Sequence, residues 1–172
     1  MCAFERSEKG MEFFMLDLFE SLSVDTPNQM RGIFASIFII QNRLQTAGEK
    51  IQSEISMKQW LLLAMVKFCP QPRTLTNIGN LMGCSRQNVK KLALTLENKG
   101  YIQLVHGKKS SICIELTNKA NIYSTKMAEK HSQTLKLLFA DFNSDEIEQL
   151  FNLYVKLYSG ITRVENFTKG LN

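Results

Sequence analysis

The sequence predicts a mainly α-helical protein with one small β-hairpin near its middle. Most of the chain repeats apolar residues at the three- and four-residue spacing of amphipathic helices. One segment, "YIQLVHGKKSSICIELT" at 101–117, instead alternates apolar and polar residues on both sides of a polar turn that contains a glycine. This pattern is typical of two paired strands. We therefore expect helices, then a hairpin, then two further helices.

The composition fits an ordinary globular domain. A chain of 172 residues with 44% hydrophobic residues can bury its core without disulfides, and its four cysteines include no C-x-x-C pair. Its two histidines are far apart, so we expect no zinc site. No apolar run approaches the roughly 18 residues of a membrane span, and the N-terminus lacks the features of a secretory signal. We expect a cytoplasmic protein without metal or cofactor, and no catalytic motif indicates an enzyme.

The first 55 residues are predicted to hold one short and one long helix. Residues 1–27 form an N-terminal extension with a short amphipathic helix, whose apolar residues are Phe13, Phe14, Leu16, Phe19 and Leu22. A long helix is expected from about Asn28 to Gln45, followed by a loop around Gly48. The side of this helix that is expected to be buried carries Ile33, Phe34, Ile37, Phe38 and Ile40.

The next helix is predicted to begin at Ser56 and to end before Pro70. Ser56 and Gln59 have the spacing of a capping box, in which each side chain accepts a hydrogen bond from the backbone N–H of the other residue. Ile55 and Trp60 are spaced to pack together as a hydrophobic staple at the same helix start. Pro70 lacks a backbone N–H, and its ring would break the helix.

The segment "TLTNIGNLMGCSRQNVKKLALTLENKG", at 74–100, predicts two helices joined by a tight turn. Gly83 accepts the positive φ that such a turn needs, and Ser85 can cap the second helix. Gly79 costs about 1 kcal/mol relative to alanine inside a helix, so we expect close approach of the second helix to offset this cost. The pattern is that of a helix-turn-helix. Its expected packing residues are Ile78 and Leu81 on the first helix and Val89, Leu92 and Leu96 on the second.

Two helices are predicted after the hairpin. The first runs from Asn118 to about Phe139. The second begins at Ser144, where Asp145 and Glu146 in the first turn interact favourably with the helix dipole. The second helix has a broad apolar face, formed by Ile147, Leu150, Phe151, Tyr154, Leu157, Tyr158 and Ile161.

The positive charge of the chain is concentrated in one segment. The net charge is +5, and residues 73–119 hold eight basic residues against two acidic ones, Glu97 and Glu115. The rest of the chain has 13 basic and 14 acidic residues, so it is close to neutral. A basic patch on an otherwise neutral scaffold is typical of a nucleic-acid surface.

Side chains of this segment are candidates for contacts with double-stranded DNA. In a helix-turn-helix the second helix enters the major groove with its first turns. Base or groove contacts are assigned to Gln87, Asn88 and Lys91, because glutamine suits adenine and lysine suits guanine or phosphate. Phosphate contacts are assigned to Ser85, Arg86, Lys90, Lys108 and Lys109.

These residues resemble a known family. The stretches "ISMKQWLLLAMV", "LTNIGNLMGCSRQNVKKLALTLENKGYI" and "ELTNKA" are similar to parts of MarR-family transcriptional regulators. Matching positions are Ser56, Gln59, Trp60, Ser85, Arg86, Gln87, Val89, Lys91 (in place of the usual arginine), Leu92, Leu96, Glu97, Gly100, Leu116 and Thr117. The resemblance covers residues from about Met30 to the end. The hairpin turn "HGKKSS" departs from it, because the usual Asp-x-Arg motif is missing.

The resemblance implies a winged helix-turn-helix domain flanked by N- and C-terminal dimerisation helices. Residues 28–55 would hold the first dimerisation helix and a loop, residues 56–118 the DNA-binding domain, and residues 119–172 the C-terminal dimerisation helices. A homodimer would repress from a pseudo-palindromic operator and be released by a small aromatic or anionic effector. Side chains that could line an effector site, each equally suited to a core, are Phe34, Phe38, Trp60, Met65 and Tyr123.

Other readings stay open from the sequence. Cys84 precedes the second helix of the helix-turn-helix, so its oxidation could disturb the DNA-binding surface and make the protein a redox-responsive regulator. A small packed thiol is the alternative for this residue. The protein could also bind DNA without sequence preference, or use the helix-turn-helix to contact another protein. A monomer with a second apolar core is the alternative to a homodimer.

Overall fold

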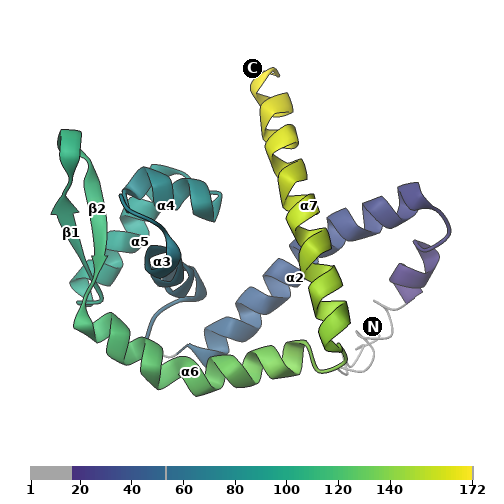
Figure 1. Cartoon of the computed structure of the whole chain (residues 1–172), viewed down its shortest axis with the longest axis horizontal. Coiled ribbons are helices and arrows are strands. Elements are labelled where there is room, and N and C mark those ends of the chain that lie inside the picture. The colour runs from purple at the N-terminus through teal and green to yellow at the C-terminus, as the bar shows by residue number, and fades with distance from the viewer. Residues whose placement is uncertain (1–16, 53, 172) are drawn as a thin grey trace, which may run out of the picture. The chain divides into compact units, whose positions relative to one another are not determined.

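A computed structural model describes residues 17–52 and 54–171, and it confirms a mainly helical fold with one hairpin (Figure 1). The side chain of Lys109 also lies outside the described part. After a helical stretch at residues 17–21, the elements are α2 (Thr26–Ile51), α3 (Met57–Phe68), α4 (Leu75–Met82), α5 (Arg86–Asn98), β1 (Ile102–His106), the 3-10 turn η1 (Lys108–Ser110), β2 (Ile112–Leu116), α6 (Asn118–Leu138) and α7 (Ser144–Lys169). The chain divides into two compact units, residues 1–118 and 119–172.

The end of the N-terminal extension packs onto the start of α2. Leu22 lies against Gly32, where an added Cβ would meet the Leu22 Cδ1 at 3.2 Å. Of the apolar residues predicted for a short helix here, Phe19 is helical and 42% exposed. Leu22 lies in the turn that follows this helical stretch, and Phe13, Phe14 and Leu16 lie outside the described residues.

Helix α2 is longer at both ends than the sequence predicted. It begins after Asp25, whose side chain accepts a hydrogen bond from the Asn28 N–H at 2.8 Å, and it continues to Ile51. The predicted loop around Gly48 was therefore wrong. Gly48 is buried inside the helix, and a Cβ at this position would meet the Met57 Cγ at 2.6 Å. This glycine permits the start of α3 to approach closely and does not form a turn.

Helices α3, α4 and α5 and the hairpin enclose the core of the first unit. The predicted capping box is confirmed, because the Gln59 N–H donates to the Ser56 Oγ at 3.2 Å and the Ser56 N–H donates to the Gln59 Oε1 at 3.1 Å. The helix ends before Pro70, as predicted. Core side chains that are at most 1% exposed are Leu62, Val66, Leu75, Ile78, Val89, Ala93, Leu96, Ile102 and Ile114.

The hairpin is attached to the helix-turn-helix by its second strand. Strands β1 and β2 pair antiparallel, with Leu104 opposite Ile114. The backbone N–H of Ile114 also donates to the carbonyl of Arg73 at 2.9 Å, and Thr74 forms an isolated bridge with Cys113. Because these two residues directly precede α4, the hairpin has a fixed position relative to the helix-turn-helix.

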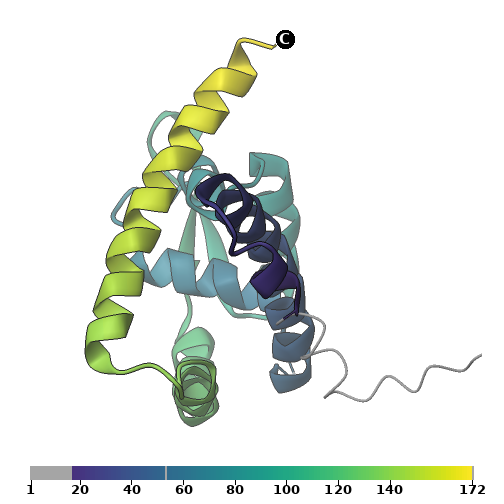
Figure 2. The same cartoon turned by 90° about the vertical axis from the view of Figure 1, so that its right-hand side faces the viewer.

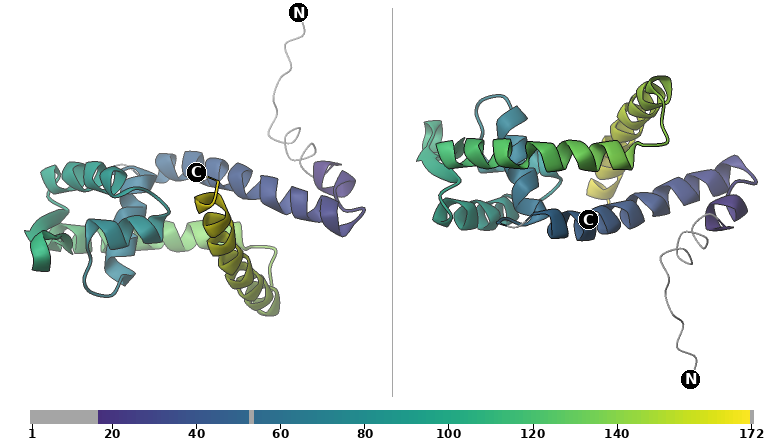
Figure 3. Two further views of the ribbon diagram at one scale, coloured as in Figure 1. Left: turned by 90° about the horizontal axis from the view of Figure 1, so that it is seen from above. Right: turned by 90° about the horizontal axis from the view of Figure 1, so that it is seen from below.

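The apolar side of α2 is largely exposed in the single chain. Phe34 is 66% exposed and Phe38 is 55% exposed, so the prediction of a buried side was wrong for the chain on its own. The remaining residues of that predicted side are Ile33 and Ile40, which are exposed, and Ile37, which is half-buried. Figures 1 and 3 show α2 extending away from the compact core of its unit.

Helices α6 and α7 form the second unit, and the chain changes direction between them (Figure 2). The residue that caps α7 is Asn143 and not the predicted Ser144. The Asn143 Oδ1 accepts from the Glu146 N–H at 3.0 Å, and the Glu146 carboxylate accepts from the Asn143 N–H at 2.9 Å. The predicted broad apolar face is present, yet no side chain of α7 is buried.

Candidate nucleic-acid interface

The turn between α4 and α5 has the geometry that the sequence predicted. Gly83 has φ 63° and ψ 32°, in the left-handed region that favours glycine. The Cys84 N–H donates to the carbonyl of Gly79 at 2.9 Å and closes the turn. A Cβ at Gly79 would meet the carbonyl oxygen of Cys84 at 2.8 Å and the Cγ2 of Val89 at 3.4 Å. The predicted close approach at Gly79 is therefore confirmed, and both the turn and the second helix contribute to it.

Ser85 caps α5, as predicted. Its Oγ accepts a hydrogen bond from the Asn88 N–H at 3.2 Å, which leaves the hydroxyl proton to donate to another acceptor. Both side chains are exposed. The first N–H groups of any helix lack intrahelical partners and form the positive end of its dipole. The start of α5 therefore has the chemistry to bind a phosphate.

One side of α5 is apolar and buried, and the opposite side is polar and exposed. Val89 and Leu96 are fully buried as predicted, but the third buried residue is Ala93, whereas Leu92 is only half-buried. Leu81 of α4 was predicted to pack against this side and is 48% exposed, so that prediction was wrong. The predicted DNA contacts on the helix are all exposed, namely Arg86, Gln87, Asn88, Lys90 and Lys91.

Two basic residues of the charged segment have structural roles. The Arg73 Nε donates to a carbonyl at the end of α3 at 3.1 Å, and the Lys99 Nζ donates to the carbonyl of Glu54 at 2.8 Å. The Glu97 carboxylate accepts from the backbone N–H of Leu104 at 2.8 Å, which directs it toward β1. The other basic residues of residues 73–118 lie in the first two turns of α5 and at the hairpin turn.

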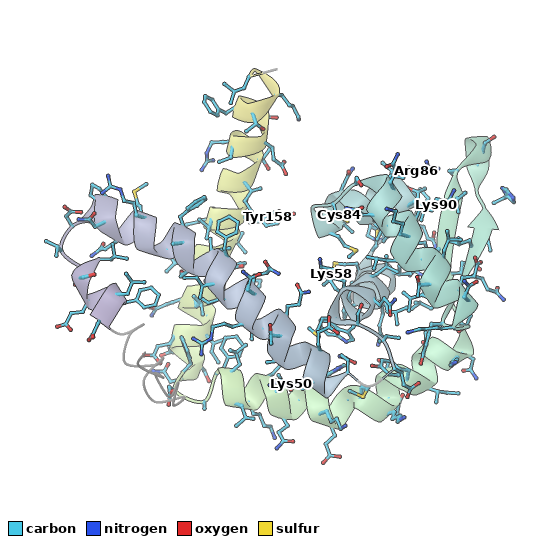
Figure 4. All side chains as sticks on the ribbon, turned by 180° about the vertical axis from the view of Figure 1, so that it is seen from behind. Lys50, Lys58, Cys84, Arg86, Lys90 and Tyr158 are labelled. Carbon is cyan, nitrogen blue, oxygen red and sulfur yellow. The ribbon has the colours of Figure 1, made fainter. Side chains whose placement is uncertain are left out.

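The hairpin turn carries the second group of candidate contacts. The Gly107 N–H donates to the carbonyl of Ser111 at 2.8 Å and closes the turn. Lys108 is exposed, whereas the side chain of Lys109 lies outside the described residues, so its contact stays a prediction. Figure 4 shows Arg86 and Lys90 projecting from α5 at the end of the unit where the hairpin turn lies.

The residues predicted to line an effector site have different environments. The rings of Phe34 and Phe38 contact each other edge to face, with centroids 5.2 Å apart. Trp60 and Met65 on α3 are half-buried, and Tyr123 on α6 is 4% exposed. An effector site that these five side chains share stays a prediction.

Three cysteines lie in the part of the chain that the structure describes, and each is a free thiol. Cys84 and Cys113 are half-buried free thiols and Cys69 is a buried one, whereas Cys2 lies outside the described residues. A redox role for Cys84 stays a prediction. Over residues 17–52 and 54–171, no group of three or more His, Cys, Asp or Glu side chains could hold a metal ion. Within the same ranges, no helix has the length and apolar character needed to cross a membrane.

Hydrogen bonds at the C-terminal end of α5 were not predicted from the sequence. The Tyr101 hydroxyl donates to the Glu54 Oε2 at 2.6 Å, and the Thr117 hydroxyl donates to the carbonyl of Gly100 at 2.7 Å. The paired residues are 47 and 17 positions apart, so no local pattern indicates these contacts. The positive φ of Gly100, 78°, marks a tight turn at this point.

Structures of MarR-family transcriptional regulators share the fold of this chain. A MarR/EmrR family regulator from Acinetobacter sp. ADP1 superposes with a TM-score of 0.70 at 22% identity, over 77% of this chain and 96% of that chain. MepR from S. aureus, in a complex with DNA, gives 0.63 at 18% identity, over 76% and 95% of the two chains. PcaV from Streptomyces coelicolor, in complex with its natural ligand, gives 0.56 at 18% identity, over 70% and 89%.

Comparison with protein-family models and with curated protein sequences gave no match. The similarity to the solved structures, at these identities, shows the fold. The chain has the winged helix-turn-helix fold of MarR-family regulators, with helices before and after the winged domain.

Proposed function

We propose that this protein is a MarR-family transcriptional regulator that binds double-stranded DNA sequence-specifically through the first turns of α5. The observation that carries the proposal is the polar side of that helix. Five side chains of types that read bases or bind phosphates are exposed there, opposite a buried apolar side. Glu97 is the only acidic residue in the α5 sequence, and its carboxylate is hydrogen-bonded to β1. A helix that packed only against protein would not need this unbalanced positive charge.

The proposed contacts divide into two groups. Gln87, Asn88 and Lys91 contact base edges or the groove, because their amide and ammonium groups match the hydrogen-bonding groups of the major groove. The remaining residues bind phosphates and fix the position of α5 on the duplex, namely Ser85, Arg86, Lys90, Lys108 and Lys109. MepR, whose fold is similar, is known in a complex with DNA.

We propose that the active form is a homodimer. Helices α2 and α7 each expose several large apolar side chains in the single chain, and large exposed apolar patches mark interaction surfaces. A two-fold dimer would place two copies of α5 in successive major grooves of a pseudo-palindromic operator. Repression, relieved by a small effector, is the regulatory mode that we propose. The structure of PcaV with its natural ligand supports an effector.

The proposal is tested by selecting bound duplexes from a random pool at near-physiological salt and sequencing them. We expect enrichment of an inverted repeat whose half-site centres lie about one helical turn apart. Binding without enrichment would instead indicate a DNA-associated protein without an operator, with a strong dependence on salt. Absence of binding, both with and without a reductant, would contradict the DNA-binding function.

Two substitutions separate sequence reading from phosphate binding. Gln87→Ala should relax one base position in each half-site and cost about 1–3 kcal/mol on the operator. Lys90→Gln should weaken binding to all DNA sequences. It should also reduce the steepness with which the logarithm of the binding constant falls with the logarithm of the salt concentration, by about 1. Lys50→Gln is the matched control, because it removes the same charge at the end of α2, away from the start of α5 (Figure 4). Equal effects of Lys90→Gln and Lys50→Gln would contradict the proposed orientation.

A further inference from the structure

The C-terminal end of α5 is attached to the connection between α2 and α3. Tyr101 follows α5 after the turn at Gly100, and its side chain is only 2% exposed. Its hydroxyl donates to the Glu54 Oε2 at 2.6 Å. The Lys99 Nζ donates to the backbone carbonyl of the same glutamate at 2.8 Å. Glu54 therefore receives two hydrogen bonds from the three residues that follow α5.

A second attachment joins the end of α5 to the end of β2. The Thr117 N–H donates to the carbonyl of Tyr101 at 3.0 Å. The Thr117 hydroxyl lies 2.7 Å from the carbonyl oxygen of Gly100 and 3.0 Å from that of Tyr101. Thr117 directly precedes α6. The backbone at 100–101 is therefore fixed from two directions.

The hydrogen bond between Tyr101 and Glu54 joins a buried tyrosine side chain to a carboxylate. A carboxylate that accepts from a hydroxyl forms a shorter and stronger hydrogen bond than a neutral acceptor does. A hydroxyl on a buried side chain is also costly to leave without a partner. The two groups are therefore held together, although they belong to segments 47 positions apart.

Movement of α2 would be passed to Glu54. The last turns of α2 are joined to the start of α3, because the Met57 N–H donates to the Glu49 Oε1 at 3.0 Å and the Met57 side chain packs against Gly48. Glu54 lies between these joined helices. A shift of the C-terminal end of α2 would therefore displace the partner of Tyr101.

We propose that Glu54, Tyr101 and Thr117 form a junction that sets the angle of α5 relative to α2 and so positions α5 on its operator. This inference rests on the proposed function of α5 as the DNA-reading helix. The helix has 13 residues, which makes it about 20 Å long. A rotation of about 10° at its C-terminal end would therefore move its first turn by about 3 Å. A displacement of this size breaks hydrogen bonds to base edges.

The junction is tested with substitutions that change single polar groups. Tyr101→Phe removes the hydroxyl, and Glu54→Gln keeps a neutral acceptor where Glu54→Ala keeps none. Ile114→Val is the matched control, because it trims a fully buried side chain of the same unit outside the junction. Hydrogen exchange of the DNA-free protein measures order at the end of α5. Affinities for the selected operator and for an unrelated duplex measure the positioning of the helix.

We expect Tyr101→Phe to retain the helical circular dichroism spectrum and to speed exchange at the amides of Tyr101 and Thr117. Affinity for the operator should fall about tenfold, while affinity for the unrelated duplex changes little. Glu54→Gln should lose less operator affinity than Glu54→Ala. Ile114→Val should change neither the exchange at these amides nor the ratio of the two affinities.

Two results would contradict the proposed role of the junction. One is unchanged exchange at the end of α5 in Tyr101→Phe, and the other is an equal loss of operator affinity in Tyr101→Phe and Ile114→Val. A wild-type protein that selects no DNA sequence would contradict the proposed function instead. In that event the hydrogen-exchange comparison would still decide whether the junction orders the end of α5.

Discussion

Gly79 and Gly48 both lie inside helices, and both permit another segment to approach closely. The neighbour differs, however. A Cβ at Gly48 would meet the flexible side chain of Met57, whereas a Cβ at Gly79 would meet the backbone carbonyl of Cys84 at 2.8 Å. A side chain can rotate away at small cost, but the carbonyl can move only with the turn that it belongs to. Gly79 is therefore the less replaceable of the two.

Gly79→Ala should lower the free energy of unfolding. Alanine gains about 1 kcal/mol in helix propensity, but the forced shift of the turn outweighs this gain, so we expect a net loss of about 1–2 kcal/mol in urea denaturation. Gly160→Ala in α7 is the control, because the nearest atom to its added Cβ is the Arg163 Nη2 at 3.6 Å. That variant should be stabilised. A Gly79→Ala protein as stable as the wild type would show that the turn yields easily.

His131 predicts a dependence of stability on pH. Partial burial on α6 desolvates its imidazole and lowers the pKa of His131 below its usual value of 6.5. Below pH 6.5 the unfolded chain therefore binds more protons than the folded chain does. Stability should be fully present above pH 6.5 and should fall as the pH decreases toward the lowered pKa. Thermal unfolding of wild type and His131→Gln at several pH values should show a smaller acid loss in the variant.

Local chemistry explains which single residues could be predicted. Gly83 and Ser85 lie two positions apart at a helix boundary, where a positive φ and a cap are needed within three residues. Gly48 has no such neighbourhood, because its role depends on Met57, nine positions later. The same residue type thus predicted a turn correctly at one position and wrongly at the other.

At the scale of elements, the cap of α5 contributes to stability and belongs to the proposed DNA contacts, and two substitutions should separate these roles. Ser85→Ala removes the acceptor for the Asn88 N–H and should cost about 1 kcal/mol of unfolding free energy. Ser85→Asp keeps a good cap but adds negative charge where a phosphate is expected. It should therefore retain stability and lose DNA affinity on all sequences, measured by denaturation and by fluorescence anisotropy. Equal DNA affinities of Ser85→Asp and wild type would place the phosphate elsewhere.

The existence of each predicted helix and strand in the described residues followed from periodicity, but the rotation of α5 about its axis did not. Val89, Leu92, Ala93 and Leu96 all have helical spacing, so the sequence allows either Leu92 or Ala93 at the centre of the buried side. The core selects Ala93, which is fully buried, and leaves Leu92 half-buried. Packing against α3 and α4 makes this choice, and a single helix cannot encode it.

At the scale of the whole molecule, the exposed apolar face of α7 predicts association. Tyr158 is 58% exposed and projects from the helix (Figure 4). Tyr158→Glu would place a charge in the proposed dimer contact, so we expect a lower molecular mass in light scattering and weaker operator binding. Lys156→Glu is the control on the polar side of the same helix and should leave the mass unchanged. A wild-type protein that is monomeric at micromolar concentration would contradict the homodimer.

The segment that carries the proposed DNA-binding surface could be proposed from the sequence, because basic residues can be counted along the chain, whereas the contacts that support this surface could not be predicted. The excess of lysine and arginine in residues 73–119 indicated the segment before any contact was known. Arg73 and Lys99 counted toward this excess, yet their side chains donate to backbone carbonyls of their own unit. Only the contacts in the folded structure distinguish basic side chains that stabilise the fold from basic side chains that are available to a ligand.

No side chain of α7 is buried in the single chain, so in the proposed dimer this helix would gain most of its stability from a second copy. Its order would then be linked to association, and the stability of the protein would rise with its concentration. Occupancy of an operator would grow more steeply than in proportion to the number of chains, because two chains must meet before one site is filled. A modest change in the rate of synthesis would therefore act on the regulated genes as a threshold.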